Sequence, residues 1–404
     1  MGLYRNILVV GNGFDLALNL PTSYLHFMKS FLRYRAEQSN LPISRIEKSD
    51  KPSLYESFAD NMNLLRNSWG AMNNTDLFDE ILLKNPFILL MIFKYNYIEL
   101  ARAKKIRVPE ISVETTMWYP KFQDTPDLSE EYFKEHDIVD NDLNWFNVEE
   151  ILHQISNKEE FCNISNFIDK CKESCHVLTN LYGAERIFGD YDTYKEHKKY
   201  QKMIEGFNLF KQSLAIYFFS VERFFEKKIQ NNFKDVKKLF TENNYDEIIS
   251  LNYTSFAERL FGIPDKFCHH PHGKISKVEP EKSEIVLGYY EDITKNRFET
   301  HFVEFQKFYQ RILYGLGNYR IKDESVRNIE LFGFSCDPAD TELLKTLLLD
   351  KNDNVNIAGL HKVLVHCFKD KNQNILNLIQ CIGKDNVLEL THQGKLEFKL
   401  DIET

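Results

Sequence analysis

The stretch NILVVGNGFDLALNLPTSYLHF, Asn6 to Phe27, decides the fold expected of this chain. Its residues 7–10 are continuously apolar, as is typical of a parallel strand that helices cover on both faces. The run ends in GNGFD, residues 11–15, where a strand is expected to give way to a helix. Gly11 and Gly13 allow either a tight corner or the close approach of a ligand to the main chain. The turn therefore predicts a strand–turn–helix unit and leaves both interpretations of its glycines open.

Similar apolar runs return only much later in the chain. They are DEIISLNY (Asp246–Tyr253), EIVLGYY (Glu284–Tyr290), IELFGFS (Ile329–Ser335) and KVLVHCF (Lys362–Phe368). Each is short and stops at a polar or glycine-bearing turn. Together with the first run they predict an α/β fold, a Rossmann-like, mostly parallel open sheet with helices on its faces.

The sequence pattern changes between the first apolar run and the later ones. Helical spacing and aromatic side chains dominate there, as in FNLFKQSLAIYFFSVERFFEKKI (Phe207–Ile229). We therefore expect residues 1–40 and 240–404 to form one discontinuous Rossmann-like α/β nucleotide-binding domain. Residues 41–239 are expected to form a large, mainly helical insertion subdomain.

Composition and charge exclude several function classes. The net charge of −9 and the sequence pI near 5.8 argue against general nucleic-acid binding, which needs a basic surface. The longest strongly apolar run, PFILLMIF (Pro86–Phe93), is far shorter than the roughly 20 residues of a membrane-spanning helix, so no membrane partner is expected. Seven scattered cysteines, and a start without the features of a signal peptide, predict a cytoplasmic protein.

Polar residues at the predicted strand ends have both structural and functional interpretations. Asp15 is either a stabilising first-turn charge or an acceptor for ribose hydroxyls or an amide. Thr22 is either a helix cap or a ligand contact. Asn252 either closes its own turn or positions a ligand at the strand end. Asp337 and Asp340 flank Pro338 and are expected to serve helix capping, Asp337 as the N-cap and Asp340 as an acid of the first turn.

Two clusters of cysteine and histidine contain residue types that zinc prefers. One is CHHPHG (Cys268–Gly273), and the other is FCNISNFIDKCKESCH, which holds Cys162, Cys171, Cys175 and His176. Neither has the spacing of a typical zinc site, so buried packing is the favoured interpretation and no metal is expected.

Several blocks of this sequence resemble the AbiH family of bacterial abortive-infection proteins. They are GNGFDLA with LPTSY, then IISLNYTSFAERLFG (Ile248–Gly262), HHPHGKI (His269–Ile275) and ELFGFSCDPAD (Glu330–Asp340). The resemblance implies an anti-phage effector with a phage-derived or host protein as trigger. A homo-oligomer is a further expectation.

The same blocks are similar, more distantly, to the NAD-binding core of sirtuins. Gly11 and Gly13 match the sirtuin first turn, and Asn252 matches the asparagine of a strand end. His272–Gly273 and Gly333–Ser335 match later motifs. Thr254 stands where sirtuins have aspartate, and Thr22 and Ser23 depart as well. The sequence also lacks a sirtuin-type zinc ribbon, so protein deacylation is poorly supported.

This similarity implies a nucleotide ligand, NAD, as substrate or cofactor. The implied catalytic residues are Asn252, which would position a water or the nicotinamide, and His272, which would act as the base. The implied NAD-binding residues are Gly11, Asn12, Gly13, Asp15, Thr22, Gly333 and Ser335. The leading hypothesis is an NAD glycohydrolase that releases nicotinamide and ADP-ribose. The alternative is a non-catalytic sensor of a nucleotide or ADP-ribose.

Overall fold

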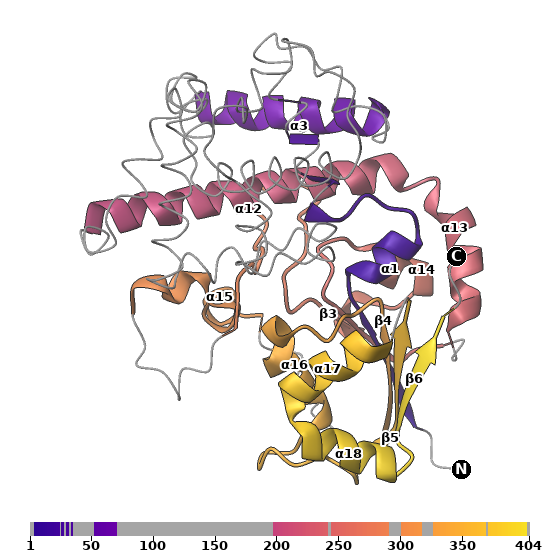
Figure 1. The fold of residues 1–404 in the computed structure, drawn as a ribbon. Helices are drawn as coiled ribbons and strands as arrows, with labels where there is room; N and C mark the ends of the chain where they lie inside the picture. Colours follow the sequence, from indigo (N-terminus) through magenta and orange to yellow (C-terminus); the bar gives the residue numbers. More distant parts are fainter. Residues whose placement is uncertain are drawn as a thin grey trace, which may run out of the picture. The chain divides into compact units, whose positions relative to one another are not determined.

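A computed structural model gives the structure of the protein (Figure 1). It describes residues 4–24, 26–27, 30–31, 34, 52–70, 197–240, 244–290, 300–316, 326–368 and 371–401. The chain divides into two compact units. The first contains residues 1–23, 51–58 and 214–404, and it holds every site residue expected from the sequence. The second contains residues 24–50 and 59–213.

The first unit is built on a six-stranded sheet in which every strand pairing is parallel. The strands are β1 (Arg5–Val10), β2 (Glu247–Ser250), β3 (Cys268–His269), β4 (Arg327–Phe332), β5 (Leu360–Cys367) and β6 (Leu396–Leu400). Their order across the sheet is β3-β2-β1-β4-β5-β6. The predicted α/β fold with a parallel sheet is therefore confirmed.

The first strand lies in the middle of this sheet. Ile7 is in register with Glu247 of β2 on one side and with Ile329 of β4 on the other. The strand order runs outward in one direction through β2 and β3, and in the other through β4, β5 and β6. This arrangement is that of a doubly wound sheet, which gathers ligands where the order reverses.

Helices connect and cover the strands. The α-helices are α1 (Asn12–Ala17), α3 (Pro52–Gly70), α12 (His197–Phe225), α13 (Ile229–Val236), α14 (Phe256–Phe261), α15 (Lys307–Leu313), α16 (Thr341–Leu348), α17 (Lys371–Ile382) and α18 (Lys384–His392). Short 3-10 helices are η3 (Lys237–Leu239), η4 (Asp265–Phe267), η5 (Pro280–Lys282), η6 (Thr300–Phe305) and η7 (Pro338–Asp340). The helical periodicity of residues 207–229 is confirmed as far as Phe225, where α12 ends.

The two faces of the sheet are packed differently. Alternate strand residues such as Ile7, Ile329 and Val363 belong to an aliphatic core with α16, α17 and α18, which lie together beside the sheet in Figure 1. The opposite face is aromatic. Phe240 stacks on Phe332 with ring centroids 4.4 Å apart, and Phe14, at 6.1 Å from Phe332, completes that layer.

One predicted strand is wrong. Glu284–Tyr290 lies fully within the described residues and forms no strand there; Tyr289 makes only an isolated bridge to Gln306. Its apolar residues are buried, and the N–H of Val286 donates to the carbonyl of His272 rather than to a sheet neighbour. An apolar run predicts that its side chains are buried, but buried side chains also occur in segments that are not strands.

Much of the predicted insertion, including Pro86–Phe93, lies outside the described residues, so the domain limits at residues 40 and 240 stay predictions. Within the described ranges, no helix combines the length and the apolarity that a membrane crossing requires.

Candidate active site

The glycine turn after β1 packs against the turn after β4. A Cβ on Gly11 would lie 2.6 Å from the carbonyl oxygen of Gly333, and a Cβ on Gly13 would lie 2.6 Å from the Cα of Gly333. The N–H of Gly13 donates to that same carbonyl at 2.8 Å. These glycines are therefore explained by close backbone packing, which is the tight-corner interpretation of the turn.

This packing also limits where a ligand can lie. The ends of β1 and β4 are the point where the strand order reverses, and their backbones are already in contact there. Main-chain atoms therefore fill the space between these two strand ends, and β2 lies on the other side of β1. On that side the chain offers the side chains of α1 and of the loop after β2.

Two of the predicted NAD-binding residues contact each other. The Thr22 hydroxyl donates to Oδ1 of Asn12 at 2.7 Å. The adjacent carbonyl of Pro21 accepts from the Tyr217 hydroxyl at 2.7 Å. Asn12 and Thr22 thus fix the segment after α1 to the start of that helix, and Thr22 is buried.

Asp15 and Asn252 come together at the ends of β1 and β2. Asp15 is 1% exposed, and its Oδ2 accepts from the Thr254 hydroxyl at 2.6 Å. The Asn252 amide lies close enough to lower the pKa of Asp15. Neither Oδ1 of Asp15 nor Nδ2 of Asn252, however, completes a hydrogen bond of ordinary geometry with the described residues. One acceptor and one donor are therefore left buried side by side.

Burial and nearby carboxylates shift the acidity of Asp15. Desolvation, with a smaller contribution from Glu222 and Glu258, raises its pKa to about 7, and it outweighs the Thr254 hydrogen bond and the nearby Asn252 amide, which lower it. Glu222 of α12 accepts from the Ser255 N–H. Although burial opposes it, ionised Glu258 is stabilised by His270 at 3.3 Å and Lys274 at 2.8 Å, and its pKa is lowered to about 2. Asp15 can thus exchange a proton near neutral pH.

His272 lies beside the same loop, but its ring faces elsewhere. Nδ1 is 3.1 Å from the carbonyl oxygen of Leu251, and Nε2 is 2.8 Å from Oδ1 of Asp340. A neutral imidazole can donate to only one of these two acceptors. Burial nevertheless lowers the pKa of His272 to about 4, with Lys307 and Arg311 acting in the same direction and Asp340 against it. Both ring nitrogens of the predicted base have protein partners.

The two aspartates expected to cap a helix behave differently. Asp337 caps η7, because its side chain accepts from the Ala339 N–H at 2.9 Å. Asp340 is the first-turn acid of η7, as expected, and its side chain makes no cap hydrogen bond to α16. Its carboxylate contacts the His272 ring at 2.8 Å and two buried cations, Lys307 at 3.0 Å and Arg311 at 3.5 Å, which are stronger partners than a backbone N–H.

The last predicted pair follows β4. Gly333 has a φ of 62° and meets the turn after β1. Ser335 is exposed, and its carbonyl accepts from Nδ2 of Asn377 in α17 at 2.9 Å. Of the predicted site, the structure thus joins Asp15 with Asn252, Asn12 with Thr22, and the three glycines with one another.

Comparison with protein families tests the family resemblance of the sequence blocks that contain these residues. The matching family is described as bacteriophage abortive infection AbiH, and the match covers residues 7–359. The chain belongs to the AbiH family. Its role is accordingly in abortive-infection defence against bacteriophage. Comparison of this AbiH protein with curated proteins and with solved structures found no match.

Sequence reasoning about this AbiH protein missed several residues that shape the site. Glu222 and Glu258 surround Asp15, and Lys307 and Arg311 surround Asp340. Glu222 and Lys307 lie on α12 and α15, whose sequences read as ordinary amphipathic helices with charged residues. Of the residues around Asp15, only Thr254 was noticeable in the sequence, because it stands where sirtuins have an aspartate. In the structure its hydroxyl donates to the carboxylate of Asp15.

A second polar cluster of the AbiH protein joins β4 and β5 to the end of β6. His366 is fully buried between two carboxylates, with Nε2 2.7 Å from Glu330 and Nδ1 2.6 Å from Asp401. The Tyr245 hydroxyl donates to the other oxygen of Glu330 at 2.7 Å. Burial lowers the pKa of His366, but the two carboxylates outweigh it and raise that pKa.

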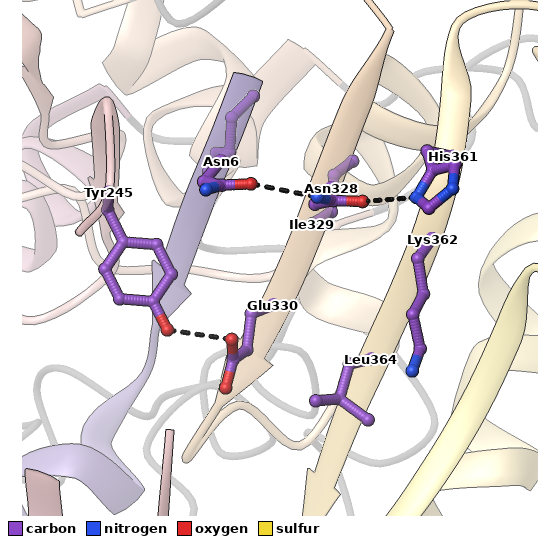
Figure 2. Close-up of a pocket in the computed structure, with 9 residues that line it drawn as sticks. Asn6, Tyr245, Asn328, Ile329, Glu330, His361, Lys362 and Leu364 are labelled. Atoms are coloured by element: carbon purple, nitrogen blue, oxygen red, sulfur yellow. Dashed lines mark hydrogen bonds between the residues drawn. The ribbon is translucent and has the colours of Figure 1, made fainter. Parts of the chain in front are cut away.

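Glu330 and Tyr245 also line a pocket of about 150 Å³ (Figure 2). Figure 2 shows Asn6, Asn328 and His361 in a row across β1, β4 and β5. Oδ1 of Asn6 accepts from Asn328 at 2.9 Å, and Oδ1 of Asn328 lies 2.8 Å from His361. These polar groups satisfy one another, so the pocket itself does not indicate a ligand.

Another candidate group of the AbiH chain, Cys162, Cys171, Cys175 and His176, falls outside the described residues. Among the residues that the structure describes, no group of three or more His, Cys, Asp or Glu side chains is arranged to hold a metal ion.

Proposed function

We propose that this AbiH protein binds NAD at the carboxyl ends of β1 and β2 and, when a phage-derived or host protein triggers it, hydrolyses NAD to nicotinamide and ADP-ribose. The observation that carries the proposal is the buried pair of Asp15 Oδ1 and Asn252 Nδ2, an acceptor and a donor left without ordinary partners at the end of a parallel sheet. Buried polar atoms of this kind are rare unless a ligand or water completes them.

The sheet supports the same location. Its order is that of Rossmann-like, doubly wound folds, which bind nucleotides beyond the carboxyl ends of their strands. Because Gly333 closes the space between β1 and β4, the proposed ligand lies over α1 and the loop after β2. Depletion of NAD in the infected cell would then be the abortive-infection step.

The proposed reaction breaks the bond between nicotinamide and ribose, whose electron pair leaves with nicotinamide. A water adds to the ribose carbon and loses its proton to a base. In this proposal Asn252 orients the ribose or the water, and His272 is the base. His272 can act so only if Nδ1 exchanges the Leu251 carbonyl for the water, while Nε2 stays with Asp340.

The test measures NAD and nicotinamide in infected cells that carry the protein, and with the purified protein. Asn252→Ala and His272→Ala are expected to lower turnover about 10²- to 10⁴-fold and to abolish phage protection. The exposed residues Asn352 and His392 provide matched controls as alanine variants. Unchanged NAD in infected cells that are nevertheless protected would contradict the hydrolase.

A non-catalytic sensor of ADP-ribose or another nucleotide is the second candidate. It is favoured by the placement of His272, because each ring nitrogen faces a protein oxygen, the Leu251 carbonyl or the Asp340 carboxylate, and must turn from it to reach a water. Under this alternative the protein binds ADP-ribose and releases no nicotinamide from NAD. The His272→Ala variant then protects cells as well as the unsubstituted protein does. Calorimetric titration with ADP-ribose, beside the nicotinamide assay, distinguishes the two functions.

A further inference from the structure

The Asp15 carboxylate is surrounded by polar and charged groups whose interaction with it depends on its charge. Thr254, from the loop after β2, donates to Oδ2 at 2.6 Å, and the Asn252 amide lies beside the carboxylate. Glu222 of α12 and Glu258 of α14 are the charged groups that face it. Glu258 is itself paired with Lys274 and His270. Burial raises the pKa of Asp15 to about 7, so the charge of this carboxylate changes near neutral pH.

Protonation of Asp15 changes what the Asn252 amide can do. Ionised Asp15 offers only acceptors, so one oxygen holds the Thr254 hydroxyl and the other attracts the N–H groups of Asn252. Protonated Asp15 has one fewer strong acceptor and no longer attracts that amide as an ion does. Asn252 is 7% exposed, and its Nδ2 has no other described partner to fix its orientation.

We propose that Asp15 is a positioning residue whose ionised carboxylate fixes the side-chain amide of Asn252 at the end of β2, so that ligand binding there depends on the proton held by Asp15. The part concerning the ligand rests on the proposed function. The part concerning the two side chains does not. Asp15 itself takes no chemical step in this proposal, and it acts through Asn252.

A ligand-free experiment tests the coupling of the two side chains. In protein labelled with ¹⁵N-asparagine, the side-chain signal of Asn252 is identified by its loss in Asn252→Ser. We expect this signal to shift in a single step with a midpoint near pH 7, and the step to vanish in Asp15→Asn. The exposed Asp385, replaced by asparagine, is the matched control. A signal that does not shift, or that shifts equally in Asp15→Asn, overturns the proposal.

Two further variants must move the midpoint in opposite directions. Thr254→Val removes the hydroxyl that stabilises ionised Asp15, so the midpoint rises. Glu222→Gln removes a repelling carboxylate while keeping an acceptor for Ser255, so the midpoint falls. A general loosening of the fold would not produce shifts of opposite sign, and equal shifts in both variants contradict the proposal.

Binding of NAD and of ADP-ribose decides the part that concerns the ligand. The affinity is expected to rise about tenfold from pH 6 to pH 8 in the unsubstituted protein, and to be independent of pH in Asp15→Asn. Equal affinity at both pH values, with the amide still titrating, overturns that part alone. If neither compound binds, even in infected-cell extract, the proposed function fails while the amide titration still decides the positioning role.

Discussion

Gly333 meets two demands at once, because its φ is 62° and its Cα hydrogens face the backbone of Gly13 and Phe14. A side chain there would be strained by the left-handed conformation and would also collide with the main chain of the turn after β1. The second demand is the one that joins the two halves of the sheet at the strand ends. It can be separated from the first by comparison with another glycine.

Gly333→Ala is expected to destabilise the protein by more than about 3 kcal/mol, since about 1–2 kcal/mol of conformational strain is added to the backbone collision. Gly394→Ala is the control, because Gly394 has a φ of 65° and open space around its missing Cβ. That variant should lose only the strain. Chemical denaturation of both measures the difference, and equal losses would contradict the packing role of Gly333.

Asp15 predicts a pH dependence of stability. Its folded pKa is raised from 3.8 to about 7, so the folded protein binds this proton more tightly than the unfolded chain. The stability that this protonation contributes is complete below about pH 4 and is lost as the pH rises to about 7. Asp15→Asn removes the penalty of burying the charge. Its stability relative to the unsubstituted protein should grow over this range by at most about 4 kcal/mol.

Denaturation curves at pH 4.5, 6 and 8 measure that growth. Asp385→Asn, on the exposed start of α18, should show no such trend. A stability difference between Asp15→Asn and the unsubstituted protein that stays constant across this range would mean that Asp15 is ionised at all these pH values.

Among the elements, β4 and β5 are joined to the end of β6 by the buried ions Glu330, His366 and Asp401. His366→Gln keeps a side chain of similar reach but leaves the two carboxylates without their cation. We expect a loss of about 3–5 kcal/mol at pH 6, because removing one member of a buried ion group leaves the others uncompensated. Because the folded pKa of His366 is raised, its contribution is complete below about 6.5 and declines as the pH rises through the folded value.

The loss caused by His366→Gln should therefore shrink between pH 6 and pH 9, as urea denaturation would show. His392→Gln, an exposed substitution in the last turn of α18, serves as the control. If the loss is as large at pH 9 as at pH 6, His366 acts in its neutral form.

The strands that could be predicted are those buried on both faces. The runs before Gly11, after Asp246, after Ile329 and after Lys362 all became strands of the sheet. The edge strand β6 was missed because LEFKL alternates between half-buried and exposed positions and resembles a surface segment. The position of Asn252 at the end of a strand could be predicted from the sequence. The proximity of Glu222 to Asp15 could not, because the two residues are about 200 positions apart and only the folded chain brings them together.

For the sheet as a whole, the position of each strand predicts its protection from solvent. β1 and β4 have a paired neighbour on both sides, whereas β3 and β6 end the order. We expect the amides of β1 and β4 to exchange with deuterium most slowly and those of β6 to exchange earlier, through local opening. Mass spectrometry of peptic peptides measures this. Equal protection of β1 and β6 would indicate that another element or molecule covers the edge at β6.

The central place of β1 also has a consequence for synthesis. The ribosome makes β1 before the other strands of this sheet, yet its partner β4 follows only after roughly 300 residues, which takes on the order of 15 to 60 s at ordinary bacterial rates. Until then neither the contact of Gly13 with Gly333 nor the site beside it can exist. A chain that stops before β4 therefore cannot assemble the middle of this sheet, and the contact between the two turns forms only after β4 has been made.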